Sequence, residues 1–152
     1  MAKKPRTITA RIPTYQKNRG QWRRNILANV RGACQEAGVR YSSDDSFEVV
    51  VLLYLKKGKR HDIHDVDNRL KDVLDALQGR FGGPKSVRTK GRLIKNDNQI
   101  CRVVMEKQPI PKMYGDDAGG KLLIRPYNAH RWPLQTSKGH RLLKRGQKQA
   151  PR

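Results

Sequence analysis

The run Phe47-Glu48-Val49-Val50-Val51-Leu52-Leu53-Tyr54-Leu55 is almost continuously apolar. A short run of this kind, rich in β-branched residues, is typical of a strand in the middle of a sheet. We therefore expect a central strand over 47–55 that is covered on both faces. The segments on either side of this run predict the elements that pack around it.

A helix is predicted after the strand, beyond a basic loop that spans 56–60. Asp65 lies where the helix would begin, because a short oxygen-bearing side chain can accept hydrogen bonds from free backbone amides there. Apolar side chains then recur at helical spacing. This stripe consists of Val66, Leu70, Val73, Leu74 and Leu77.

A strand and a helix are also predicted before the central strand. The segment 7–12 alternates apolar and polar residues, which is typical of a half-buried strand. From Trp22 to Ala37 the apolar residues recur at helical spacing, and Gly38 lies where a helix commonly ends.

The segment after the second helix is less regular. A glycine-rich basic loop covers 78–92, and strand patterns follow at 93–94 and 100–106 with a turn at 96–98. Prolines and scattered basic residues replace the periodic pattern from Gln108 onward. We expect a compact domain over 1–107 and an extended basic arm over 108–152. Five apolar residues could anchor part of that arm on the domain: Leu122, Leu123, Ile124, Tyr127 and Trp132.

The predicted order of elements is strand, helix, strand, helix, strand. A chain of 152 residues allows one domain rather than two. We therefore expect an α+β fold with two layers, in which a short mixed sheet carries both helices.

The charge of the chain is strongly one-sided. Its 34 lysines and arginines and 13 acidic residues give a formal net charge of +21. Solubility alone requires a net charge of only about 2 to 8. A charge this large repels itself unless a polyanion neutralises it, and nucleic acid is the usual polyanion.

Several other classes of protein are disfavoured. No apolar run is long enough to span a membrane, and the first six residues lack the apolar core of a secretory signal. Cys34 and Cys101 have neither disulfide-framework nor zinc-site spacing. We expect a cytoplasmic protein with reduced thiols and no membrane partner.

An acidic motif stands out in this basic chain. Asp65 and Asp67 lie at the start of the second predicted helix, Lys71 follows one turn later, and Asp97 precedes the last strand. Carboxylate oxygens without sulfur ligands suit Mg²⁺ or Mn²⁺. Such a metal can activate a water molecule and stabilise charge on a phosphate, and the lysine could stabilise the charged transition state.

Each of these residues also has a plain structural interpretation. Asp65 could be only a helix cap, Asp67 and Lys71 only a surface ion pair, and Asp97 only a turn residue. His61 and His64 stand three residues apart, so a zinc site is conceivable, but loop histidines that are solvated or touch phosphate are the better interpretation.

The motif resembles that of the RusA-type Holliday junction resolvases. The resemblance rests on Asp65-Val66-Asp67-Asn68, Lys71, Leu74-Asp75-Ala76-Leu77 and Asp97 before Gln99-Ile100. It covers about 7–107 and includes the apolar strand and the basic loop before the motif. Three features depart from the family: Asn96 replaces a usual aspartate, the segment between Leu77 and Asp97 is longer, and a basic arm is added.

The resemblance implies a homodimeric, Mg²⁺-dependent endonuclease that acts on four-way or other branched DNA. Asp65, Asp67 and Asp97 would be the catalytic and metal-binding aspartates, and Lys71 the essential lysine. Asn68, Asp75 and Asn96 would support them without touching the metal. The context would be the nucleoid of a bacterium or a phage-infected cell.

Basic residues near the motif are the predicted contacts to nucleic acid. They are Lys56, Lys57, Lys59, Arg60, Arg69, Lys85, Arg88 and Lys90. The alternative is a non-catalytic nucleic-acid-binding protein of the same fold, such as a ribosomal or other ribonucleoprotein component with RNA as its partner. Metal-dependent cleavage distinguishes the two.

Overall fold

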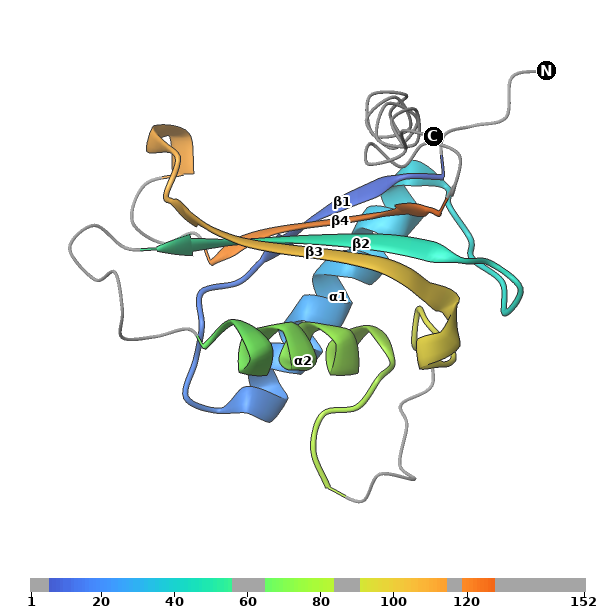
Figure 1. Cartoon of the computed structure of the whole chain (residues 1–152), viewed down its shortest axis with the longest axis horizontal. Helices are drawn as coiled ribbons and strands as arrows, with labels where there is room; N and C mark the ends of the chain where they lie inside the picture. The colour runs from blue at the N-terminus through green and yellow to red at the C-terminus, as the bar shows by residue number, and fades with distance from the viewer. Residues whose placement is uncertain (1–5, 56–64, 84–90, 115–118, 128–152) are drawn as a thin grey trace, which may run out of the picture.

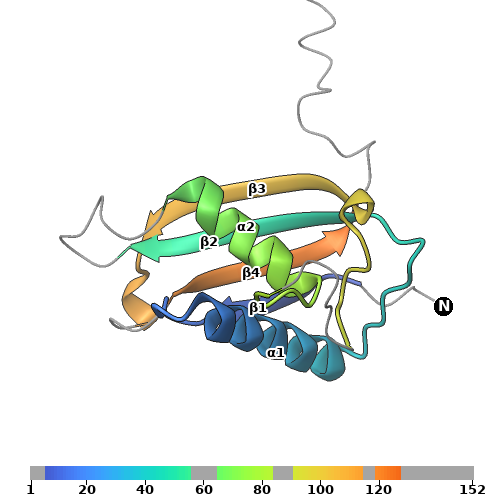
Figure 2. The same cartoon turned by 90° about the horizontal axis from the view of Figure 1, so that it is seen from below.

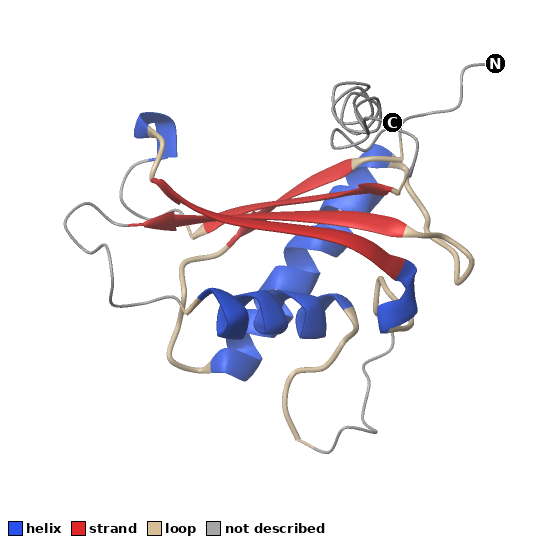
Figure 3. Ribbon diagram, viewed as in Figure 1, coloured by secondary structure: helices blue, strands red, loops and turns tan. Residues whose placement is uncertain are grey.

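Four strands and two helices build the part of the chain that the computed structural model describes, residues 6–55, 65–83, 91–114 and 119–127. The elements in order are β1 (Ile8–Ile12), α1 (Arg19–Ala37), β2 (Phe47–Leu55), α2 (Val66–Leu77), β3 (Ile100–Pro109) and β4 (Gly120–Pro126). Two short 3-10 helices, η1 (Asp97–Gln99) and η2 (Lys112–Tyr114), flank β3 (Figure 3).

The strands form a single mixed sheet in the order β1-β4-β2-β3. β2 runs parallel to β3 and antiparallel to β4, and β4 runs antiparallel to β1. Both helices lie on the same face of this sheet (Figures 1 and 2). The predicted two-layer α+β architecture is therefore confirmed.

The core lies between the helices and the sheet. Phe47, Val49 and Val51 of β2 are fully buried there, together with Trp22 and Ile26 of α1. The predicted bounds of β2 are confirmed, but the expectation that both of its faces are covered is wrong. Alternate residues of a strand point to opposite faces, and Val50 and Leu52 on the helix-free face stay partly exposed.

We expected the domain to end at Lys107. It extends further, because Lys107 lies within β3. The chain returns as β4 and inserts between β1 and β2, with Val51 opposite Leu122 and Val49 opposite Ile124. Three of the predicted anchor residues, Leu122, Leu123 and Ile124, therefore belong to an internal strand, and Leu122 and Ile124 are buried. The predicted arm beyond 127 lies outside the described residues, and Trp132 with it.

The predicted end of α1 at Gly38 is confirmed, whereas its N-cap, Asn18, was not predicted. The Asn18 side chain accepts a hydrogen bond from the Gln21 amide at 3.0 Å, and Gly38 closes α1 in the left-handed conformation with φ of 63°. Residues 93–94 are not a strand; Ile94 is instead fully buried, and its amide donates to the Leu77 carbonyl at 3.0 Å.

Neither helix in the described ranges is both long and apolar enough to cross a bilayer.

Candidate metal site on the first turn of α2

The first turn of α2 exposes the acidic motif to solvent. Asp65 is the N-cap, as predicted: its Oδ1 accepts a hydrogen bond from the Asp67 amide at 3.3 Å. Its Oδ2 accepts a hydrogen bond from Asn68 Nδ2 at 2.9 Å. Asn68 therefore orients the Asp65 carboxylate.

Asp67 and Lys71 are both exposed, and they lie one turn apart on the helix. The start of a helix carries a partial positive charge that favours carboxylates by roughly 0.3–1 kcal/mol. Two carboxylates and an ammonium group thus share a solvent-accessible surface at the N-terminal end of α2. Mg²⁺ is commonly held by one or two carboxylates together with substrate phosphate oxygens.

Asp97 lies at the opposite end of α2. It begins η1, and its Oδ1 accepts a hydrogen bond from the side-chain amide of Gln78, the residue that follows the helix. A helix of 12 residues is about 18 Å long, at about 1.5 Å per residue. Figure 1 shows η1 beside the far end of α2 from the acidic turn.

We expected Asp97 to lie close to Asp65 and Asp67. Within one protomer it does not, because it lies at the other end of α2. The described residues contain no group of three acidic, histidine or cysteine side chains arranged to hold a metal. The reason is topological, because β2 and β3 are parallel and the helix between them must run back along the sheet. A residue before β3 then lies at the other end of α2 from a residue that begins the helix.

The turn that carries Asp97 is held by side chains on both sides. Asn96 caps η1, and its Oδ1 accepts a hydrogen bond from the Asn98 amide at 2.9 Å. Gln99 is buried; its Nε2 donates to the carbonyls of Ser42 and Asp45, and its Oε1 accepts from the Lys95 amide. Asn96 thus acts on the turn, and no contact joins it to the acidic turn of α2.

Asp75 does not support the predicted metal ligands. Its carboxylate lies 3.2 Å from the Arg23 guanidinium and 4.0 Å from that of Arg80. Sequence reasoning also missed Asp72, which is fully buried. Its position on the polar side of α2 suggested a surface residue, and only the packing of α2 on α1 buries it.

Three arginines surround the Asp72 carboxylate. Arg19 and Arg23 of α1 donate to its Oδ1, at 2.8 Å and 2.6 Å for their Nη2 atoms, and Arg69 donates to its Oδ2 at 2.7 Å. Burial acts to raise the pKa of Asp72, but the hydrogen bonds from Arg19 and Arg23 outweigh it and hold that pKa below its usual value.

Arg69 is not available to nucleic acid in this structure, although we predicted a contact from it. Its side chain is 13% exposed and is paired with Asp72. The guanidinium also lies over the Tyr15 ring, 3.9 Å from its centroid. Arg69 therefore holds α2 against the segment that precedes α1, which contains Tyr15.

The other predicted contacts to nucleic acid lie outside the described residues. These are Lys56, Lys57, Lys59, Arg60, Lys85, Arg88 and Lys90, and the two histidines of the conceivable zinc site, His61 and His64, lie there as well.

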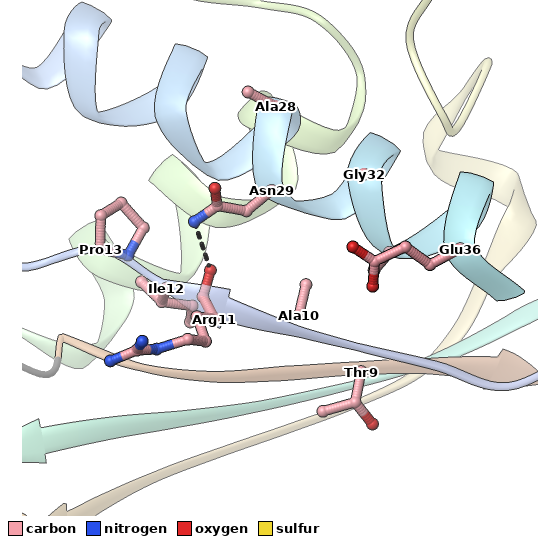
Figure 4. Close-up of a pocket in the computed structure, with 10 residues that line it drawn as sticks. Thr9, Ala10, Arg11, Ile12, Pro13, Ala28, Asn29, Gly32 and Glu36 are labelled. Carbon is pink, nitrogen blue, oxygen red and sulfur yellow. Dashed lines mark hydrogen bonds between the residues drawn. The ribbon is translucent and has the colours of Figure 1, made fainter. Parts of the chain in front are cut away.

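A cavity of about 550 Å³ lies elsewhere, between β1 and α1 (Figure 4). Small side chains such as Ala28 and Ala10 line it with Gly32, and Asn29 Nδ2 donates to the Arg11 carbonyl at its rim at 3.0 Å. None of the predicted site residues lines this cavity.

Comparison with known proteins adds no relative, because neither the protein-family models nor the curated proteins contain a match to this chain.

Proposed function

We propose that this protein is a Mg²⁺-dependent endonuclease of the RusA type that cleaves four-way or other branched DNA as a symmetric homodimer. The observation that carries the proposal is the exposed first turn of α2. It presents Asp65, Asp67 and Lys71 together, with Asn68 orienting Asp65. The net charge of +21 supports a polyanionic substrate.

The residues of this turn fit a hard divalent cation. Asp65 and Asp67 offer oxygen donors at a solvent-accessible helix start, which suits Mg²⁺ or Mn²⁺ and leaves room for a phosphate. The metal would supply an activated water molecule and charge stabilisation at the scissile phosphate. Lys71, one turn away, would stabilise the negative charge that develops on the phosphate oxygens.

The position of Asp97 gives the homodimer a role in the site. Because α2 is about 18 Å long, Asp97 of the same chain does not reach a metal held by Asp65 and Asp67. Asp97 of the partner subunit reaches it if the two-fold axis sets the two copies of α2 antiparallel. The dimer would then have two equivalent sites, as paired nicks in a junction require, and each site would combine residues of both chains.

The second candidate function is nucleic-acid binding without cleavage, as in a ribonucleoprotein component. The separation of Asp97 from the other carboxylates within one chain favours it, because a monomer would lack a three-carboxylate site.

Cleavage of a synthetic four-way DNA junction tests the proposal. Paired symmetric nicks should require Mg²⁺, disappear with EDTA, and fall at least about a hundredfold in Asp67→Asn. Asp44→Asn is the matched control, because Asp44 is also exposed but lies in the turn before β2. Tight, salt-sensitive binding without cleavage would instead support the non-catalytic candidate.

A further inference from the structure

The sheet has two edges, formed by β1 and β3, and they differ in how they are protected. β1 is five residues long and is followed by Pro13, and the Asn29 side chain donates a hydrogen bond to the Arg11 carbonyl within it. β3 is ten residues long, and no strand among the described residues pairs with its outer side. Long unprotected edge strands readily pair with another chain.

The centre of β3 is apolar and partly exposed. Val103, Val104 and Met105 are all half-buried, although β2 covers only one side of the strand. Val103 and Met105 share the face that carries the helices, because they lie opposite Val49 and Val51 of β2. An added strand would cover the exposed part of these side chains.

The sequence of β3 favours antiparallel pairing with a second copy of the same strand. An antiparallel pair centred on Val104 places Arg102 opposite Glu106 and Val103 opposite Met105, and the same contacts recur across the axis. Opposite charges that face each other across strands are favourable, and like charges there are unfavourable. We propose that a second copy of this chain pairs with β3 in this antiparallel register, so that two four-stranded sheets join into one.

The surroundings of Arg102 fit this register. Arg102 and Arg125 both contact the carboxylate of Glu48, so two guanidinium groups share one acidic partner on the helix-free face. Glu106 of the partner subunit would approach Arg102 on this same face and supply a second carboxylate. The pairing would thus add a carboxylate to this face of a chain that is strongly basic.

The register also places the partner's Asp97 where the proposed function needs it, and this consequence rests on that proposal. Asp97 lies just before β3 begins, whereas α2 begins at the end of the sheet where β3 finishes (Figures 1 and 2). Antiparallel pairing reverses the second β3, so Asp97 of the partner subunit lies beside the end of the first. That is the end of the sheet where Asp65 and Asp67 are exposed.

Disulfide trapping tests the register. In a Cys101→Ser background, Val104→Cys should form a covalent dimer on mild oxidation, because the two positions face each other across the axis at a distance that a disulfide spans. Thr9→Cys in the same background is the control, since Thr9 is exposed on the other edge strand. A covalent dimer through position 9 and none through position 104 would overturn the proposal.

Light scattering after gel filtration gives an independent measurement that needs no cysteine. The wild type should be a dimer, and Glu106→Arg should weaken the dimer about tenfold or more, because Arg102 would then face an arginine. Glu106 is exposed, so this variant should still fold, as circular dichroism can show. Gln35→Arg, which adds a positive charge at an exposed position on α1 and leaves β3 unchanged, is the control.

These results separate the interface from the proposed activity. A dimer that is trapped at position 104 but never cleaves DNA leaves the interface intact and refutes the nuclease. A cleaving dimer that is neither trapped at position 104 nor weakened by Glu106→Arg refutes the interface alone. A wild type that stays monomeric at all concentrations also overturns it.

Discussion

The side-chain amide of Gln78 donates a hydrogen bond to the carboxylate of Asp97 and holds it at the C-terminal end of α2. Gln78 is 1% exposed, so its side chain is shielded from bulk solvent. The hydrogen bond joins the end of the helix to the turn before β3, two segments that are 19 residues apart in the chain. It therefore orients a carboxylate that the proposed metal site would use.

Replacement of Gln78 should impair cleavage through this orientation. Residues that orient metal ligands typically contribute about 10- to 100-fold in metal affinity or activity. We expect Gln78→Met to lower junction cleavage by that amount and to shift the Mg²⁺ titration to higher concentration. Gln21→Met, an exposed glutamine on α1, should cleave like the wild type. An unchanged Mg²⁺ titration in Gln78→Met would count against a role for Asp97 in metal binding.

Mixing two inactive variants tests whether the site combines two chains. Asp67→Asn and Asp97→Asn should each be inactive as homodimers, but the mixed dimer contains one site in which both positions are wild type. Random exchange should restore roughly a quarter of the wild-type sites, because half of the dimers are mixed and each has one intact site. The measurement is the rate of single nicks in a four-way junction after co-refolding of the two variants.

The matched control mixes Asp65→Asn with Asp67→Asn. Both positions lie on the same turn of α2, so no mixed dimer contains an intact site. Recovery in this control, or none in the first mixture, would show that the carboxylates do not combine across the dimer.

The elements with a clear apolar pattern could be predicted from the sequence, and those without one could not. The bounds of β2 follow from its continuous apolar run, and those of α2 follow from its periodicity and from the Asp65 cap. β4 was missed because it follows a proline-containing segment and places only Leu122 and Ile124 of its large apolar residues in the core. Asp65 and Asp67 could be placed together from the sequence, because they are two residues apart at the start of one helix. The position of Asp97 could not, because it depends on the direction in which α2 crosses the sheet.

Three carboxyl groups that are paired with arginines predict how the stability of the protein depends on pH. The folded-state pKa values of Asp72, Glu48 and Asp45 are all below their usual values, and that of Asp45 is about 2 because Arg6 hydrogen-bonds to it. A carboxyl whose pKa falls on folding stabilises the protein above its unfolded pKa of about 4. This stabilisation is lost as the pH falls from about 4 through the lower folded-state values. The free energy of unfolding, measured with urea, should therefore drop steeply over this range.

Asp72→Asn should remove most of the contribution of the ion cluster around Asp72 at neutral pH. Breaking a buried ion pair commonly costs about 3–5 kcal/mol, because its partners stay buried without a counter-charge. Asp44→Asn, at an exposed position, should change the free energy of unfolding by less than about 0.5 kcal/mol. Equal stability of Asp72→Asn and the wild type at pH 7 would show that the three arginines do not depend on this carboxylate.

The insertion of β4 between β1 and β2 depends on a glycine at its first residue. A Cβ atom on Gly120 would lie 2.2 Å from the backbone oxygen of Leu52, a distance that the paired strands cannot accommodate without moving apart. Gly120→Ala should therefore lower the free energy of unfolding by about 1–3 kcal/mol, as overpacking of a well-packed site usually does.

Gly32→Ala on α1 is the matched control, since nothing lies within 4 Å of its added Cβ. Alanine is a better helix former than glycine, so this second variant should gain about 0.5–1 kcal/mol. Urea unfolding of the two variants measures both effects, and a Gly120→Ala variant as stable as the wild type would contradict the close approach of β4 to β2.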